Sequence, residues 1–202
     1  MGSNLFATLI SAFALLFSGY SFYESVVRAP QMEIFVPPKI NYTDPDRPDN
    51  PFEVFIVPLT LANDGARTGT VLSIVLEVKN SKSGARKKFI ASKLGTWGNE
   101  SGEAFAPIVL PGKGSVSESI QFFPQVGENV PRILDLEPGS YDFRIILDVA
   151  SAGSDSLFAP KLNPLSFSMQ AGQMDYRRFT GSGTMEMWSA NYQSATTQSV
   201  EQ

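Results

Sequence analysis

The chain of 202 residues contains no cysteine and no histidine. Without cysteine it forms no disulfide and offers no thiolate to a metal or an iron–sulfur cluster, and without histidine it lacks a principal zinc ligand. Serine–histidine and cysteine–histidine catalytic pairs are excluded for the same reason, as is acid–base catalysis by imidazole. We therefore expect a protein that is not an enzyme and that holds neither a cofactor nor a metal ion.

Basic residues are few as well. The chain has 16 lysines and arginines against 20 aspartates and glutamates, and its formal net charge is -4. This balance provides no broad positive field for the phosphates of a nucleic acid. We expect no nucleic acid among the partners.

The basic residues that are present gather on one predicted hairpin, at Lys79, Lys82, Arg86, Lys87 and Lys88. The simpler interpretation is solvent-exposed charge on the hairpin. The alternative is that Arg86, Lys87 and Lys88 contact anionic lipid head groups or an acidic neighbouring protein.

A long uncharged run near the N-terminus is the clearest feature that the chain does have. From Leu5 to Tyr23 no side chain is charged. A helix of this length, rising about 1.5 Å per residue, crosses the roughly 30 Å hydrocarbon core of a bilayer. Tyr20, Phe22 and Tyr23 lie at its end, where aromatic rings favour the head-group region. The sequence predicts a transmembrane helix within residues 1–25.

A cleaved signal peptide and a buried soluble helix remain as alternatives. A signal peptide has basic residues ahead of its apolar core and a small-x-small cleavage site after it. Here the leader MGSN has no Lys or Arg, and the Ala-x-Ala sequence at Ala12–Ala14 lies inside the run. Arg28 and Lys39 follow the run, so the positive-inside rule leans toward a cytoplasmic domain, although long domains are translocated despite their charge.

Residues 26–51 are expected to form a connector. Gln31–Val36 is a candidate first strand, but Pro37-Pro38 and the run TDPDRPDNP favour an extended, turn-rich path, because proline fixes φ and has no N–H to donate. We expect a spacer that holds the next domain off the membrane or lays it against a neighbour.

An acidic cluster within this connector is a candidate cation site. It consists of Asp44, Asp46, Asp49 and Asn50, whose oxygens are ligands that calcium prefers. Two prolines interrupt the cluster and a third follows it, and no glycine provides the sharp turn of an EF-hand loop. A solvated linker is the simpler interpretation, with calcium binding as the alternative.

Residues 52–172 show the period of two that is typical of half-buried antiparallel strands. Apolar residues occupy alternate positions in three segments: Leu72, Ile74, Leu76 and Val78; Tyr141, Phe143, Ile145, Leu147 and Val149; Leu165, Phe167, Met169 and Ala171. Further strands are expected at 52–62, 88–94, 106–110 and 116–123, with Gly-containing turns between them. Seven or eight short strands at this spacing predict an all-β fold, an antiparallel β-sandwich.

Two motifs resemble immunoglobulin-like and fibronectin type III-like domains. The segment Leu136–Phe143 has the form L-x-P-G-x-Y-x-F, which is similar to the start of the penultimate strand in those families. The stretch LTLANDGARTGTV, residues 59–71, is similar to the connection between the second and third strands of bacterial Ig-like domains. The resemblance implies an Ig-like sandwich and assigns no function.

Residues 173–202 are expected to form an extended polar tail. Gly181-Ser182-Gly183-Thr184 and the closing SATTQSVEQ have the composition of disordered segments. Met185, Met187 and Trp188 interrupt this polar sequence. One interpretation is a frayed tail, and the other is a tail that orders when these three side chains bind a partner.

The hypothesis that fits these features is a single-pass, non-enzymatic accessory subunit that stabilises a larger membrane complex. Its partners are expected to be integral membrane subunits and the lipid bilayer, and respiratory or photosynthetic assemblies are one setting. Small residues on the helix are expected to pack against a partner helix: Ala7, Ser11, Ala14, Ser18 and Gly19. The alternative is a membrane-tethered module that binds a ligand or another surface.

Overall fold

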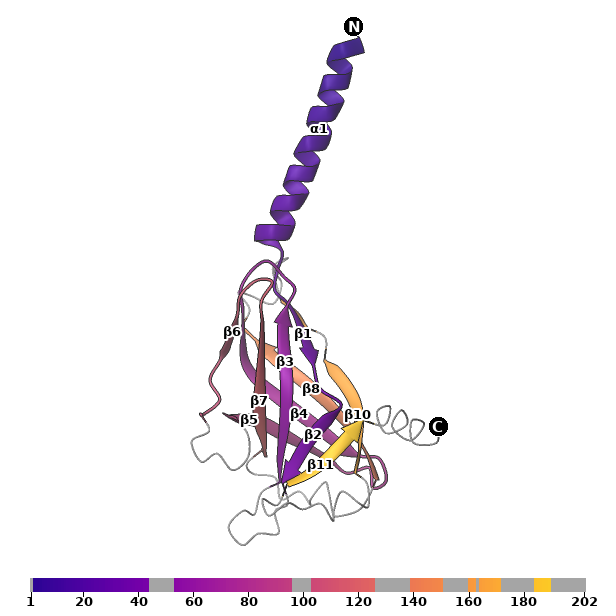
Figure 1. Ribbon diagram of the computed structural model, residues 1–202, viewed down its shortest axis with the longest axis vertical. Helices are drawn as coiled ribbons and strands as arrows, with labels where there is room; N and C mark the ends of the chain where they lie inside the picture. The colour runs from indigo at the N-terminus through magenta and orange to yellow at the C-terminus, as the bar shows by residue number, and fades with distance from the viewer. Residues whose placement is uncertain are drawn as a thin grey trace, which may run out of the picture.

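A computed structural model describes residues 2–43, 53–95, 103–125, 139–150, 160–162, 164–171 and 184–189. An N-terminal helix stands on one end of a β domain, and strands such as β3 and β7 run along the same long dimension as the helix (Figure 1). The helix α1 spans Gly2–Phe22, and a π-helical turn, Tyr23–Val27, continues it.

Among the described residues, the domain has eleven strands. They are β1 (Gln31–Phe35), β2 (Lys39–Thr43), β3 (Val54–Asn63), β4 (Gly69–Asn80), β5 (Arg86–Leu94), β6 (Ile108–Leu110), β7 (Ser115–Pro124), β8 (Gly139–Val149), β9 (Lys161–Leu162), β10 (Leu165–Ala171) and β11 (Thr184–Ser189).

Eight of these strands close into an antiparallel barrel. The order is β2-β11-β10-β8-β4-β5-β7-β3, and β3 pairs back with β2 through Val54–Ile56. Three strands extend this ring, since β1 pairs with β3, β9 pairs with β1 in parallel, and β6 pairs with β4. The predicted Ig-like sandwich is therefore wrong, although the all-β character is confirmed. A sandwich has two separate sheets, whereas here β5 pairs with both β4 and β7, and β2 joins β3 to β11.

The predicted connector contributes two strands to this sheet. β1 pairs with residues 60–63 of β3, and β2 pairs with residues 54–56 of the same strand. Residues 36–38, which include Pro37-Pro38, separate the two strands, as expected where proline removes backbone donors. The chain between the helix and Thr43 thus belongs to the domain and does not hold it at a distance.

The predicted tail also contributes a strand. β11 lies between β10 and β2, and its Met185 and Met187 are buried in the chain's own core. Trp188 is half-buried, with the Lys39 ammonium 5.5 Å from its ring centroid. Residues 184–189 of the predicted tail thus form a strand whose methionines pack inside the barrel, while residues 173–183 and 190–202 lie outside the described residues.

Aromatic rings fill part of the barrel interior. The Phe55 ring lies 5.0 Å from that of Tyr42, 4.9 Å from Phe89 and 5.4 Å from Phe143, measured between centroids. The Phe143 ring in turn stacks on Phe167 at 5.2 Å. Contacts of this kind are typical of an eight-stranded barrel whose interior is packed with side chains.

The buried face of β4 differs from the prediction at the start of the strand. In β4, Ile74, Leu76 and Val78 are buried as expected, but Leu72 is 43% exposed and Val71 is buried in its place. The pairing of β4 with β8 shifts register between Val71 and Ser73. Such a bulge adds one residue and moves the preceding side chains to the opposite face.

Candidate functional site

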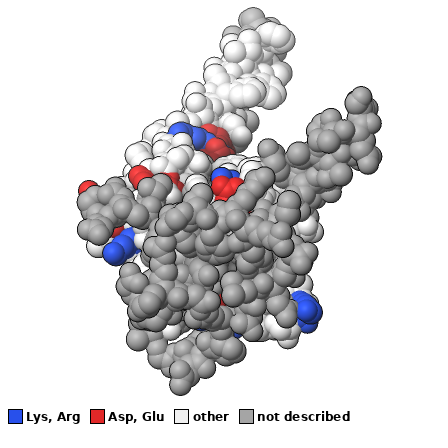
Figure 2. Space-filling view, turned by 60° about the horizontal axis from the view of Figure 1, so that its bottom comes forward, with Lys and Arg blue, Asp and Glu red and all other residues white. Residues whose placement is uncertain are grey.

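The helix is the first candidate surface. Residues 6–27 are long and apolar enough to cross a membrane, and none of this stretch is buried against the domain. A buried soluble helix is therefore excluded, whereas length and composition alone do not distinguish an anchor from a signal sequence. Figure 2 shows the described helix without charged side chains until its base, where basic and acidic groups meet.

Four of the predicted small residues share one side of this helix. Ala7, Ser11, Ala14 and Ser18 are spaced by four, three and four residues, so at about 100° per residue they form a narrow stripe. Gly19 is about 100° around the helix from Ser18 and lies outside the stripe.

Ser21 and Ser25 continue the same spacing and were not predicted as part of it. The Ser25 hydroxyl donates to the Ser21 carbonyl at 2.7 Å, and the Ser11 hydroxyl donates to the Ala7 carbonyl at 2.9 Å. These bonds satisfy the hydroxyls within the helix, as an apolar surrounding requires.

Arg28 fixes the base of the helix to the domain. Its guanidinium donates to the Glu24 carboxylate at 2.8 Å and to the Gln31 side-chain oxygen at 2.8 Å, and lies 3.5 Å from Asp64. The hydrogen bond to Glu24 raises the pKa of Arg28, and its partial desolvation opposes this shift. The guanidinium therefore stays charged at all physiological pH values.

Backbone contacts hold the same junction. The amides of Ala66 and Arg67 donate to the Arg28 carbonyl at 3.1 and 3.2 Å, and the amide of Asp64 donates to the Gln31 carbonyl at 2.8 Å. A Cβ on Gly65 would lie 2.1 Å from the Ala29 carbonyl oxygen, so only glycine permits this approach.

The side chain of Asn63 joins three segments beneath this contact. Its Oδ1 accepts from the amides of Gln31 and Gly65 at 3.1 and 3.0 Å, and its Nδ2 donates to the carbonyls of Arg67 and Leu110 at 2.8 and 3.2 Å. The Asn63-Asp64-Gly65 sequence indicates a turn, but it does not show that this turn contacts the segment directly after the helix. The structure therefore identifies Arg28 and Asn63 as residues of the junction between helix and barrel, a role that the sequence did not predict.

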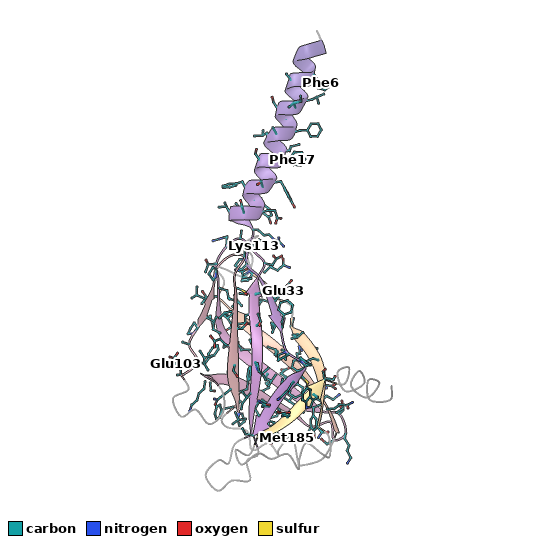
Figure 3. All side chains as sticks on the ribbon, in the orientation of Figure 1. Phe6, Phe17, Glu33, Glu103, Lys113 and Met185 are labelled. Carbon is teal, nitrogen blue, oxygen red and sulfur yellow. The ribbon has the colours of Figure 1, made fainter. Side chains whose placement is uncertain are left out.

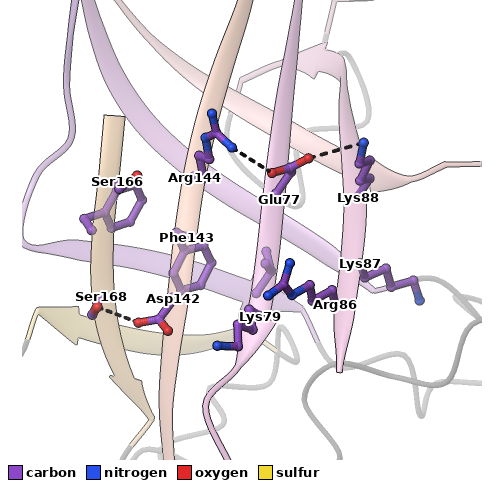
Figure 4. Close-up of a pocket in the computed structure, with 12 residues that line it drawn as sticks. Glu77, Lys79, Arg86, Lys87, Lys88, Asp142, Phe143, Arg144, Ser166 and Ser168 are labelled. Carbon is purple, nitrogen blue, oxygen red and sulfur yellow. Dashed lines mark hydrogen bonds and ion pairs between the residues drawn. The ribbon is translucent and has the colours of Figure 1, made fainter. Parts of the chain in front are cut away.

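A groove on the outer face of β5, β4, β8 and β10 is the second candidate surface (Figure 4). It encloses about 590 Å³. Two rows of outward side chains cross the four strands. The first row is Lys88, Glu77, Arg144 and Ser166, and the second is Arg86, Lys79, Asp142 and Ser168.

The first row is internally paired. Glu77 lies 3.2 Å from the Lys88 ammonium and 3.9 Å from the Arg144 guanidinium. In the second row, Asp142 accepts hydrogen bonds from the hydroxyls of Ser168 and Ser81, at 2.7 and 3.4 Å. Both acidic side chains of the groove are thus already engaged.

Arg86 and Lys79 form no ion pair with any residue that the structure describes, although Asp142 on β8 is the cross-strand neighbour of Lys79. They are direct cross-strand neighbours on β5 and β4. Like charges in directly opposed positions destabilise a sheet. The pair therefore forms a local concentration of positive charge in the groove.

Lys87 lines the groove but does not direct its charge into it, although the sequence grouped it with Arg86 and Lys88. Its ammonium points away from the groove and binds the buried Glu53 carboxylate at 2.7 Å (Figure 4). The Tyr42 hydroxyl donates to the same carboxylate at 3.2 Å. Lys87 follows the inward alternation of its strand with Phe89 and Ala91, so its ammonium faces the barrel interior.

The predicted calcium cluster stays a prediction, because its members lie outside the described residues: Asp44, Asp46, Asp49 and Asn50. Within the described ranges, no three acidic side chains gather in a way that suits a metal ion.

No family model matches the chain. No curated protein is similar to it in sequence. The function must therefore be argued from the surfaces themselves.

Proposed function

We propose that this protein is a non-enzymatic, single-pass membrane-anchored accessory subunit that stabilises a larger membrane complex. The observation that carries the proposal is the fixed junction between helix and barrel. Arg28 and the 63–67 turn replace the flexible linker that a freely moving module would have. A helix face and a barrel face held in constant relation bind neighbouring subunits with little loss of conformational entropy.

The small-residue stripe on α1 supplies the intramembrane contact. In lipid, helices associate through close packing, and small side chains let the two backbones approach. Ala7, Ser11, Ala14 and Ser18 offer such a surface over about 16 Å of helix, at 1.5 Å per residue. Elsewhere on the exposed helix, large side chains such as Leu9, Phe13 and Leu16 alternate with smaller ones such as Ala12 and Gly19.

Co-purification from detergent-solubilised membranes tests this proposal. We expect the protein to appear with integral membrane subunits in a constant stoichiometry. Substituting Ala14→Leu fills the stripe and is expected to reduce that assembly at least about tenfold, since lost packing of 1.4 kcal/mol corresponds to that factor. Ala12→Leu makes the same chemical change on another side of the helix and serves as the matched control.

A protein that runs alone as a monomer contradicts the proposal, as does an Ala14→Leu variant that assembles as well as the Ala12→Leu control. The first result favours the alternative function, a membrane-tethered module that binds a ligand. The groove is the feature that speaks for this alternative, because it is a hollow with polar side chains around it.

A further inference from the structure

The groove on β5, β4, β8 and β10 carries an excess of positive charge. Lys79, Arg86, Lys88 and Arg144 line it with their charged groups, against the carboxylates of Glu77 and Asp142. The fifth basic residue on its wall, Lys87, turns its ammonium into the barrel. The groove is thus locally positive on a chain whose formal net charge is -4.

The groove lies far from the base of the helix. β4 starts at Gly69, which packs against Pro30 and Met32 directly below the helix. Lys79 is ten residues further along this strand, a path of roughly 30 Å at 3.3 Å per residue. The membrane that holds the helix is therefore out of reach of Lys79 and Arg86, and its lipids are not their counter-ions.

The arrangement of the two cations fits a carboxylate. A carboxylate placed between Lys79 and Arg86 would receive a planar, two-donor contact from the guanidinium and a third donor from the ammonium. It would also remove the repulsion between these opposed side chains. Ser166 and Ser168 lie on β10 at the other side of the groove. The Ser168 hydroxyl already donates to Asp142 but could still accept a hydrogen bond from the backbone of an extended chain, and the Ser166 hydroxyl could donate or accept one.

We propose that this groove binds an acidic, extended peptide segment of a neighbouring protein, with one carboxylate seated between Lys79 and Arg86. This inference deepens the proposed function by naming the chemistry of one partner. Its test uses a peptide and the isolated full chain, so its failure is distinguishable from a failure of membrane assembly.

The experiment measures binding of a fluorescein-labelled hexaglutamate peptide to the full chain in a non-ionic detergent. Fluorescence anisotropy is recorded at low salt and again at about 0.15 M salt, where the Debye length falls to about 8 Å. We expect binding that Lys79→Glu and Arg86→Glu each weaken at least about tenfold, as expected when a charge-assisted contact becomes repulsive.

Lys93→Glu is the matched control. Lys93 is exposed on the same strand as Arg86, seven residues away, and does not line the groove. We expect this variant to bind hexaglutamate within about twofold of the parent chain, because a residue roughly 20 Å along the strand lies beyond the screening length. Equal weakening in Lys93→Glu and in the groove variants overturns the proposal.

Thermal unfolding separates loss of binding from loss of the fold. Arg86→Glu places a carboxylate opposite Lys79 and turns a repulsive cross-strand pair into an attractive one. We expect its midpoint of unfolding to equal or exceed that of the parent chain while hexaglutamate binding is lost. The uncharged variant Arg86→Gln provides a second measurement if Arg86→Glu does not fold.

Competition identifies the class of partner. Phosphatidylserine vesicles, an oligothymidylate and inorganic phosphate are each added to the labelled peptide complex. We expect unlabelled hexaglutamate to displace the peptide at lower concentrations of charged groups than any of the three. Displacement at a lower concentration by vesicles, oligonucleotide or phosphate overturns the assignment to an acidic peptide.

Discussion

Glu53 and Lys87 form an ion pair inside the barrel, at the end that lies away from the helix. Their side chains are 1% and 9% exposed, and the Tyr42 hydroxyl is the neighbouring donor to Glu53. Two charges taken out of water stabilise a fold only while both remain, since the desolvation cost of each is offset by the other. Each member of this pair therefore depends on its partner.

Glu53→Gln tests this dependence. The amide keeps an oxygen for Tyr42 but leaves the Lys87 ammonium without its counter-charge, and we expect the free energy of unfolding to fall by about 3–5 kcal/mol. The double variant Glu53→Gln, Lys87→Met removes both charges, and we expect it to recover most of this loss. Chemical denaturation of the parent chain, Glu53→Gln, Lys87→Met and the double variant measures both effects. A single variant as stable as the parent chain contradicts the account.

Lys87 shows which features of a side chain the local sequence predicts and which it does not. The alternation Lys87, Phe89, Ala91 already indicates an inward side chain, because Phe89 and Ala91 are apolar and two residues apart. The sequence does not indicate its partner, since Glu53 is 34 residues away and the two meet only when β5 and the start of β3 close the barrel. The sequence therefore suggested one basic surface for Arg86, Lys87 and Lys88, whereas Arg86 and Lys88 point outward and Lys87 points into the barrel.

The strand β11 was the element hardest to find in the sequence. It has six residues, TMEMWS, within a polar and low-complexity stretch, so its alternation covers only Met185 and Met187. By contrast, β4, β8 and β10 carry long alternating patterns and were predicted. Which strands pair was not predictable, because sandwich and barrel strands share the same period of two.

Met187→Ala distinguishes a barrel strand from a tail that serves a partner. Met187 is fully buried, and truncating a buried methionine costs about 2–5 kcal/mol through lost burial and the cavity left behind. We expect a loss of this size in the isolated chain, measured by chemical denaturation. Glu186→Ala is the control on the same strand, where a half-exposed ion pair with Lys39 is lost at a cost of at most about 1 kcal/mol.

An isolated chain in which Met187→Ala and Glu186→Ala are equally stable contradicts the place of β11 in the barrel. That result would return Met185 and Met187 to the role that the sequence first indicated, a contact with another protein. The comparison needs no knowledge of the partner, because both variants are measured in the chain alone.

The helix and the barrel form one continuous body, whose two candidate surfaces lie at its two ends (Figures 1 and 3). Lys113 marks the end next to the helix and Met185 the end away from it. The sequence predicted the helix and the all-β domain but placed a spacer between them. The difference arises at Arg28, Asn63 and Gly65, whose contacts join segments more than 30 residues apart. No local pattern encodes a contact of that range.

This continuity makes the junction itself testable. Inserting Gly-Ser-Gly-Ser between Val27 and Arg28 separates the helix from the barrel and breaks the Arg28–Glu24 ion pair and the bond from the Arg28 amide to the Tyr23 carbonyl. The contacts of Arg28 with Gln31 and of its carbonyl with Ala66 remain on the barrel side, so we expect the thermal midpoint of the barrel to change by no more than about 2–4 °C, the effect of 1 kcal/mol in a chain of this size. Assembly with membrane subunits is expected to fall, because a flexible linker adds an entropic cost of ordering to every contact that uses both surfaces.

The same four residues placed ahead of Gly2 serve as the control, since they leave the junction intact and should leave assembly unchanged. If both insertions assemble equally well, the fixed junction is not what the protein uses to hold its partners, and a tethered binding module explains the structure better.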